Sequence, residues 1–313
     1  MRGRILLLTS LRAAEEKAWQ EALQSVLPGE RIVTRHEAGE LSDIEIAIVA
    51  NPPKGVLGRL PRLKWVQSLW AGVDMLLADE TFPRQIPLVR LIDPALARAM
   101  AEPVATHVLA LHRRLPLYAE QQRRAVWRQH EMPLAGERCV GVMGLGNLGI
   151  AAVNVLNSLG FKVNGWSRTK KSLEYVETFA GEEGLSDFLG RSEILVNLLS
   201  LTDETRGILS SELFKQLPMG AQIINFARGA HLVEKDLLGA LEEGRLGHAV
   251  LDVFSTEPLP EGHLFWRHPK ITVLPHVAAL TDRGSASKIV AENIHRYRND
   301  NKLPDQVDPE LGY

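Results

Sequence analysis

The stretch CVGVMGLGNLG, residues 139–149, joins a short apolar run to a G-x-G-x-x-G motif and leads directly into a helical pattern at Leu148–Leu159. A strand before the glycines and a helix after them is the context in which this motif indicates a dinucleotide-binding loop. The first glycine allows a tight turn, the second lets backbone amides approach a pyrophosphate, and the third lets helix and strand pack closely. A glycine-rich turn without a ligand is the alternative. The residues predicted to bind the dinucleotide are Gly144, Leu145, Gly146, Asn147, Leu148 and Gly149.

The residues after the next expected strand indicate which dinucleotide is preferred. A cofactor without a 2'-phosphate favours an acidic residue about 20 positions beyond the glycine motif, where its carboxylate accepts hydrogen bonds from the ribose hydroxyls. This sequence instead has Ser167, Arg168 and Thr169, followed by two lysines. Hydroxyls and cations suit a phosphate dianion, so NADPH (bound as NADP after oxidation) is predicted to be preferred, with NADH a possible second cofactor. The alternative is that Arg168, Lys170 and Lys171 merely begin an exposed helix.

Short apolar runs alternate with amphipathic stretches on both sides of the motif, which predicts an α/β fold with mainly parallel strands. Six strands suited to a doubly wound Rossmann sheet are expected at Cys139–Met143, Phe161–Trp166, Ile194–Leu199, Gln222–Phe226, His248–Val253 and Ile271–Leu274. Four more are expected earlier, at Ile5–Leu8, Ile44–Val49, Lys64–Ser68 and Leu88–Leu91. A long helix from Pro94 toward Leu115, with Pro103 and Pro116 as kinks or stops, could link two domains.

Length and composition limit the classes of protein. A chain of 313 residues predicts two domains, and 45% hydrophobic residues, 24% charged residues and a net charge of −2 do not suggest nucleic acid or membrane as a partner. The arginine-rich stretch 112–130 is interrupted by Glu120, so a solvated helix face is favoured there. Ile5–Leu8 is too short for the core of a signal peptide. A single cysteine, Cys139, excludes an intramolecular disulfide and fits a cytoplasmic location; no metal site is expected.

Three segments that follow expected strands each carry one reactive side chain: Arg228, Glu257 and His276. An open α/β sheet binds its ligands at the carboxyl ends of its strands. Arginine can hold a carboxylate through two parallel hydrogen bonds, and histidine can protonate a carbonyl oxygen while hydride adds to the carbon. Glu257 would orient the imidazole and favour its protonated form. Together they predict reduction of a 2-oxo acid, although each alone could be a surface ion pair, a turn residue or a strand-end histidine.

The sequence resembles the D-isomer-specific 2-hydroxyacid dehydrogenase family in four segments, which occur in the family's order and with suitable spacing. They are the glycine loop, the Arg228-Gly229 segment, the DVFSTEPL segment at 252–259 and the Pro275-His276 segment. The resemblance extends from Glu102 onward. It implies a Rossmann doubly wound parallel sheet plus a smaller flavodoxin-like α/β substrate domain, an active-site cleft between the two, and a homodimer. We expect the substrate domain to be discontinuous, at residues 1–101 and 283–313, and the dinucleotide-binding domain to occupy residues 102–282.

Further site residues follow from the resemblance alone. It implies the roles argued above for Arg228, Glu257 and His276, the first and last of them in contact with substrate, and implies that Asp252 contacts the nicotinamide carboxamide. A strand-end cap is an equally good interpretation of Asp252. The resemblance also implies that backbone amides of Trp70, Ala71 and Gly72 meet the substrate carboxylate, with a simple turn as the alternative. Trp127 could enter the active site of a partner subunit or lie in the core.

Within the family, the segments at 166–169, 225–229 and 275–279 and the ending Gln306-Val307-Asp308 look most like the bacterial glyoxylate/hydroxypyruvate reductases. That implies NADPH-dependent reduction of glyoxylate to glycolate and of hydroxypyruvate to D-glycerate. The rival enzymes are a broader 2-oxo acid reductase and a formate or phosphite dehydrogenase on the same scaffold. A dinucleotide-sensing corepressor is the rival from another class, and the Arg228, Glu257 and His276 set argues against it.

Overall fold

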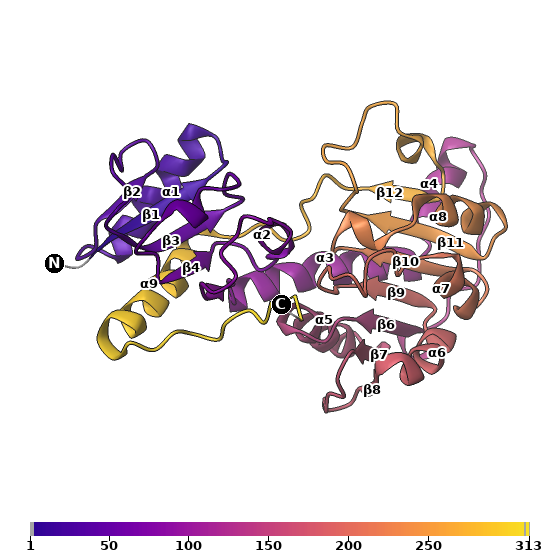
Figure 1. The fold of residues 1–313 in the computed structure, drawn as a ribbon. Helices are drawn as coiled ribbons and strands as arrows, with labels where there is room; N and C mark the ends of the chain where they lie inside the picture. Colours follow the sequence, from indigo (N-terminus) through magenta and orange to yellow (C-terminus); the bar gives the residue numbers. More distant parts are fainter. Residues whose placement is uncertain (1–2, 310, 313) are drawn as a thin grey trace. The chain divides into compact units, whose positions relative to one another are not determined.

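The protein has two units, and each is built around one parallel β-sheet (Figure 1). The structure is a computed structural model and describes residues 3–309, 311 and 312. Unit 1 comprises Met1–Ala95 and Thr281–Tyr313, and unit 2 comprises Leu96–Leu280. The first boundary lies earlier than the expected division at residue 101, because helix α3 (Pro94–His112) buries Met100 and Val104 in the core of unit 2. The chain therefore passes between the units twice.

Unit 1 has a five-stranded sheet in the order β2-β1-β3-β4-β5, and all of its neighbouring strands are parallel. This is the strand order of flavodoxin-like folds. Its strands are β1 (Arg4–Thr9), β2 (Ile32–Thr34), β3 (Ile44–Ala50), β4 (Trp65–Ser68) and β5 (Leu88–Val89). Its helices are α1 (Ala13–Val26), the 3₁₀ turn η1 (Leu57–Arg59), α2 (Asp74–Leu77) and α9 (Arg283–Asp300). Strand β2 was not expected from the sequence, since its three residues are too few to show the alternation typical of a strand.

Helix α9 returns to unit 1 from the far end of the sequence. It covers one face of the sheet together with α1, and its Val290 and Ile294 share a buried cluster with Trp19. At its end Arg298, almost fully buried, donates hydrogen bonds to the carboxylates of Glu30 and Glu45 over 2.7–3.1 Å. Buried carboxylates and a guanidinium require one another, because loss of either partner leaves an uncompensated charge out of water. This ion cluster ties the last helix to the first strands.

Unit 2 has a seven-stranded parallel sheet in the order β12-β11-β10-β9-β6-β7-β8, which is a Rossmann order with one strand added. Its strands are β6 (Cys139–Met143), β7 (Lys162–Ser167), β8 (Glu177–Ala180), β9 (Ile194–Asn197), β10 (Ala221–Asn225), β11 (Leu246–Leu251) and β12 (Ile271–Val273). Its helices after α3 are α4 (Leu115–Arg123), α5 (Asn147–Ser158), α6 (Gly181–Arg191), α7 (Ser211–Gln216) and α8 (Glu234–Glu242). Short 3₁₀ turns lie at η2 (Ala135–Glu137), η3 (Gly229–His231) and η4 (Leu264–Arg267). The predicted α/β fold class is confirmed.

The expectation of six strands in this sheet was wrong. Strand β8 and helix α6 were not expected from the sequence, because three glycines and several acidic residues obscure the helical pattern of residues 181–191. Phe188 and Leu189 nevertheless bury completely against the sheet. The prolines also behave differently from expectation: α3 continues through Pro103, and Pro116 lies in the first turn of α4, where a proline is tolerated.

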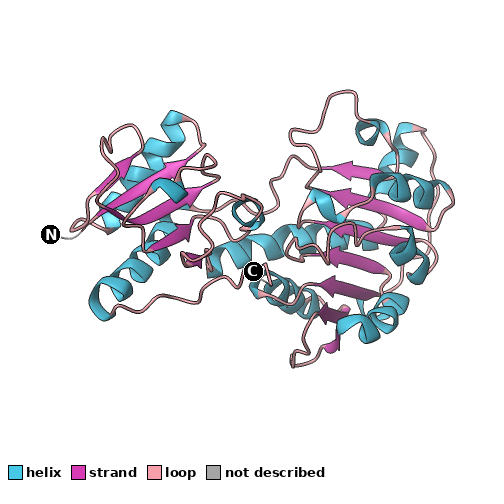
Figure 2. Ribbon diagram, viewed as in Figure 1, coloured by secondary structure: helices cyan, strands magenta, loops and turns pink. Residues whose placement is uncertain are grey.

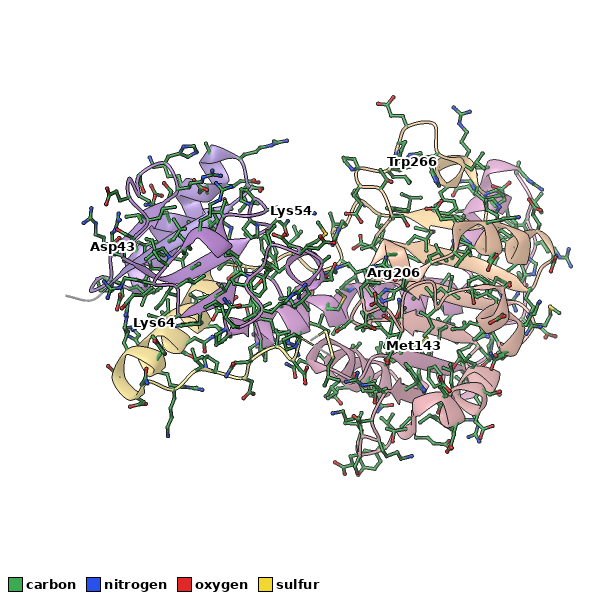
Figure 3. The ribbon with its side chains drawn as sticks, viewed as in Figure 1. Asp43, Lys54, Lys64, Met143, Arg206 and Trp266 are labelled. Carbon is green, nitrogen blue, oxygen red and sulfur yellow. The ribbon has the colours of Figure 1, made fainter. Side chains whose placement is uncertain are left out.

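Helices cover both faces of the large sheet (Figure 2). Helices α3 and α5 pack on one face, and α6, α7 and α8 pack on the other. Met143, labelled in Figure 3, ends the strand before the glycine loop. Its side chain is fully buried in the cluster that α6, α7 and α8 form with the sheet. The strand order reverses between β6 and β9, so the carboxyl ends of these two strands form the switch point at which such sheets bind ligands.

A buried histidine makes the stability of unit 2 depend on pH. His248 on β11 is 6% exposed and bonds through Nε2 to Thr272 Oγ1 at 2.9 Å. Burial lowers the pKa of His248 to about 4, and the rings of His268 and His107 add to the effect. An unfolded histidine has a pKa of about 6.5, so the unfolded chain binds this proton more readily, and stability present above pH 6.5 is lost as the pH falls toward 4.

The variant His248→Gln, which keeps a hydrogen-bonding group but cannot titrate, is expected to reduce that dependence. Between pH 7 and pH 4.5 the wild-type free energy of unfolding should fall by about 2–3 kcal/mol more than that of the variant. Urea unfolding followed by circular dichroism at the two pH values measures the difference. The same loss in both proteins would contradict the assignment.

Candidate active site

The glycine loop connects β6 to α5, and its three glycines meet different constraints. Gly144 has φ of +97°, and its N–H donates to Trp166 O at 2.8 Å. A Cβ on Gly149 would lie 1.8 Å from Gly144 O, so only glycine lets the helix approach the turn this closely. At Gly146 a Cβ would meet no atom within 4 Å, which leaves the backbone before the first turn of α5 accessible. An open amide face at a helix N-terminus suits the pyrophosphate of a dinucleotide.

The turn after β7 carries the residues expected to select the cofactor. Ser167 ends the strand, and its hydroxyl donates to Thr169 O at 2.8 Å. Arg168 is half-buried, and the exposed Lys170 donates through Nζ to Thr178 O at 2.5 Å. The turn is irregular, so the alternative in which the lysines begin a helix is wrong. Cations and hydroxyls without a carboxylate at this position fit a ribose phosphate.

A histidine and a glutamate form the reactive pair. Nδ1 of His276 lies 2.7 Å from Oε2 of Glu257, and Oε1 of the same carboxylate accepts the N–H of Phe254 at 2.9 Å. Both carboxylate oxygens are thus engaged, which fixes the glutamate and, through it, the imidazole plane. Both side chains remain partly exposed, at 51% for His276 and 36% for Glu257. Since Nδ1 faces the carboxylate, Nε2 is the ring atom that can exchange a proton with a substrate.

Asp252 holds the backbone from which His276 projects. His276 has φ of 55°, and its N–H donates to Asp252 O at 2.9 Å. The Asp252 carboxylate, 1% exposed, accepts the N–H groups of Val277 at 2.8 Å and Ala278 at 2.9 Å. These bonds stabilise a left-handed backbone conformation that is uncommon for residues other than glycine. They correspond to the strand-end cap considered for Asp252, and a contact of Asp252 with the nicotinamide stays a prediction.

Arg228 lies on the turn that follows β10. Its guanidinium is partly buried and donates from Nη1 to Ala227 O at 2.8 Å. The next residue, Gly229, passes so close to the Glu257 loop that a Cβ on it would lie 1.9 Å from the carbonyl carbon of Phe254. Phe254 in turn donates its N–H to Glu257. The arginine turn and the reactive pair are therefore packed neighbours at one end of the sheet.

A half-buried histidine that was not expected from the sequence lies beside this group. His107 on α3 packs edge-on against Phe226, with ring centroids 5.6 Å apart. Burial lowers the pKa of His107 from its ordinary value, while the negative charge of Asp252 opposes that effect. His107 carried no recognisable motif, because a histidine on an apolar helix resembles a core residue. Within the described part of the chain, no cluster of three or more metal-binding side chains occurs.

The loop at Trp70, Ala71 and Gly72 belongs to unit 1. The Trp70 N–H donates to Ser68 Oγ at 3.0 Å, and the Trp70 ring packs edge-on against Trp19. That amide therefore donates a hydrogen bond within unit 1. Contact of Trp70, Ala71 and Gly72 with a substrate carboxylate stays a prediction.

Comparisons with known proteins cover nearly the whole chain. Residues 105–278 match the model of the D-isomer specific 2-hydroxyacid dehydrogenase, NAD binding domain. The glyoxylate/hydroxypyruvate reductase A of Serratia proteamaculans (strain 568) is 42% identical over 305 residues, 96% of each chain. A D-isomer specific 2-hydroxyacid dehydrogenase from Xanthobacter autotrophicus Py2, solved with NADPH and MES, superimposes with a TM-score of 0.94 at 39% identity over 100% of both chains. An NADPH-dependent glyoxylate/hydroxypyruvate reductase from Sinorhizobium meliloti, solved with NADP and sulfate, gives a TM-score of 0.92 at 37% identity over 99% of this chain and 100% of that one.

Proposed function

Because the chain belongs to the D-isomer specific 2-hydroxyacid dehydrogenase family, we propose that it is an NADPH-dependent reductase of glyoxylate and hydroxypyruvate, forming glycolate and D-glycerate. The observation that carries the proposal is the His276–Glu257 pair, 2.7 Å apart and packed beside the Arg228 turn. A protein that only sensed the dinucleotide would have no need of a proton donor there. The Serratia and Sinorhizobium reductases support the choice of substrates.

The reaction adds two electrons and two protons to the carbonyl group, as a hydride on the carbon and a proton on the oxygen. Arg228 holds the substrate carboxylate and polarises the adjacent carbonyl group through charge-assisted hydrogen bonds. When bound, NADPH supplies the hydride that forms the new C–H bond. His276 gives the proton on Nε2 to the carbonyl oxygen, so that no alkoxide has to accumulate. Glu257 stabilises the imidazolium before the transfer and keeps the ring in place after it.

The stereochemistry of the product tests this proposal. Hydroxypyruvate and NADPH should give glycerate of the D configuration, which chiral chromatography of the reaction mixture identifies. L-Glycerate, or a racemic product, would contradict the proposed orientation of substrate between the hydride and His276.

The cofactor preference is expected to depend on Arg168. The change Arg168→Ala should raise KM for NADPH about 10–100-fold, the effect of losing a hydrogen bond to a charged phosphate, and should leave KM for NADH within about twofold. Lys162→Ala, an exposed residue at the opposite end of the same strand, is the control and should alter neither value. Initial rates with varied cofactor provide all four constants. Equal changes for the two cofactors in Arg168→Ala would exclude this residue from phosphate recognition.

We propose a homodimer in which a second copy covers the apolar residues of the α4 region. Among them Leu115 is 54% exposed, Trp127 97% and Leu134 76%. The alternative that placed Trp127 in the core is wrong, because its ring is almost completely exposed. Sedimentation velocity measures the assembly state.

A cytoplasmic location is part of the same proposal. Within the described residues no helix has the length and apolarity to cross a membrane.

A further inference from the structure

Three polar side chains that the reaction does not use lie completely buried behind Arg228. They are Asn197 at the end of β9, Asn225 at the end of β10, and His231 in the turn η3, and each is 0% exposed. Asn197 and Asn225 are paired across the two strands. Buried polar groups are costly unless they are hydrogen-bonded, so their bonds indicate what they stabilise.

The two amides hold the carbonyl side of Arg228. Nδ2 of Asn197 donates to Oδ1 of Asn225 at 3.0 Å, and Nδ2 of Asn225 donates to Arg228 O at 3.0 Å. Oδ1 of Asn197 accepts the N–H of Leu199 at 3.2 Å, which fixes the chain just before Ser200.

The imidazole of His231 binds the other polar group of the Arg228 backbone, its N–H. The N–H of Arg228 donates to Nδ1 of His231 at 3.2 Å, and Nε2 of His231 lies 3.3 Å from Ser200 O. The hydrogen bonds therefore form a circuit that runs from Asn197 through Asn225, Arg228 and His231 to Ser200, three residues after its start. Both backbone polar groups of Arg228 are part of it.

These partners determine the protonation of His231. A backbone N–H only donates and a carbonyl only accepts, so Nδ1 carries the lone pair and Nε2 carries the hydrogen. The ring is the neutral Nε2–H tautomer, accepting from Arg228 at one atom and donating to Ser200 at the other. An asparagine at this position reaches only the site of Nδ1, and a glutamine reaches only the site of Nε2. Neither side chain can therefore make both hydrogen bonds.

We propose that His231 is a positioning residue for Arg228: by accepting the Arg228 N–H and anchoring the turn to Ser200, it sets the direction in which the guanidinium meets the substrate carboxylate. The inference rests on the proposed function, in which Arg228 binds that carboxylate. Gly229 strengthens it, because the close approach to Phe254 transmits any shift of this turn to the Glu257 loop.

The test compares His231→Asn with His231→Gln. Asparagine places its carbonyl oxygen near the site of Nδ1 and can still accept the Arg228 N–H, whereas glutamine places its amide nitrogen near Nε2 and leaves that N–H without an acceptor. We expect KM for glyoxylate and the Kd for oxalate, a carboxylate ligand that cannot be reduced, to rise about tenfold or more in His231→Gln and by less than about threefold in His231→Asn. The Kd for NADPH should stay within about twofold in both.

Oxalate binding to the NADP-loaded protein, measured by calorimetry, needs no turnover and separates the two claims. Wild-type protein that binds oxalate but does not reduce glyoxylate would refute the proposed function and leave the comparison of variants valid. Unchanged oxalate and glyoxylate constants in His231→Gln would overturn the positioning role, and so would equal losses in both variants that parallel a loss of Tm. Failure of wild type to bind oxalate would overturn it as well, since Arg228 would then hold no carboxylate.

Discussion

Replacement of His276 by alanine is expected to lower kcat for glyoxylate reduction by about 10²–10⁴-fold, the contribution of a positioned general acid. The Glu257 carboxylate orients the ring through the 2.7 Å contact at Nδ1. Alanine leaves the carbonyl oxygen to be protonated by water. Because His276 lies apart from the glycine loop in sequence and on a separate strand end, the Kd for NADPH should not change by more than about twofold. Stopped-flow single turnover measures the chemical step directly.

The variant Glu257→Gln provides the matched control for this role. It keeps the size of the side chain and removes the charge that holds the ring in place, so kcat should fall by about tenfold or more while the Kd for NADPH stays within about twofold. The loss should be smaller than in His276→Ala, which removes the proton donor itself. Near-normal kcat for His276→Ala across the pH range would refute the assignment of His276 as the acid.

Changing Arg228 is expected to lower kcat/KM for hydroxypyruvate by about 10²–10³-fold, comparable to the loss of one donor that stabilises a developing oxyanion. The structure positions this side chain through buried bonds on both sides of its backbone. Lysine should recover only part of the loss, because a point charge cannot replace the planar fork that binds a carboxylate through two parallel bonds. Initial rates for wild type, Arg228→Ala and Arg228→Lys measure the loss of kcat/KM in each variant.

The exposed ion pair of Arg191 with Glu177 offers a control for general effects of removing an arginine from unit 2. Arg191→Ala should keep wild-type kcat/KM. If Arg228→Lys were as active as wild type, two-point binding of the carboxylate would be excluded. Full activity of Arg228→Ala would remove this residue from the reaction altogether.

The sequence was sufficient to predict those parts of the fold that depend on a few consecutive residues. The glycine motif lies where strand, turn and helix follow one another, and the predicted strand at residues 139–143 has the observed bounds. By contrast, β8 and α6 depend on tertiary contact: Phe188 is buried by the sheet, yet its neighbours are glycines and acids that weaken the helical signal. Elements of this kind are stabilised by packing more than by propensity.

In the candidate site, too, some features could be predicted from the sequence and others could not. Arg228, Glu257 and His276 could be named because each follows a strand and has obvious chemistry, and the structure places the last two in contact. The bonds that orient them could not be foreseen. Asp252 binds the backbone of residues 25 and 26 positions away, and His231 acts on Arg228 through one ring atom. Such partners depend on the register of the strands and on the path of loops, which no short window of sequence contains.

Reduction of glyoxylate and hydroxypyruvate with NADPH is tested most directly by initial rates of absorbance loss at 340 nm. The assay offers glyoxylate, hydroxypyruvate or pyruvate together with either NADPH or NADH. We expect fast turnover of glyoxylate and hydroxypyruvate with NADPH, much weaker rates with NADH, and loss of activity in His276→Ala. No turnover of either substrate by protein that binds NADPH tightly would refute the proposed function.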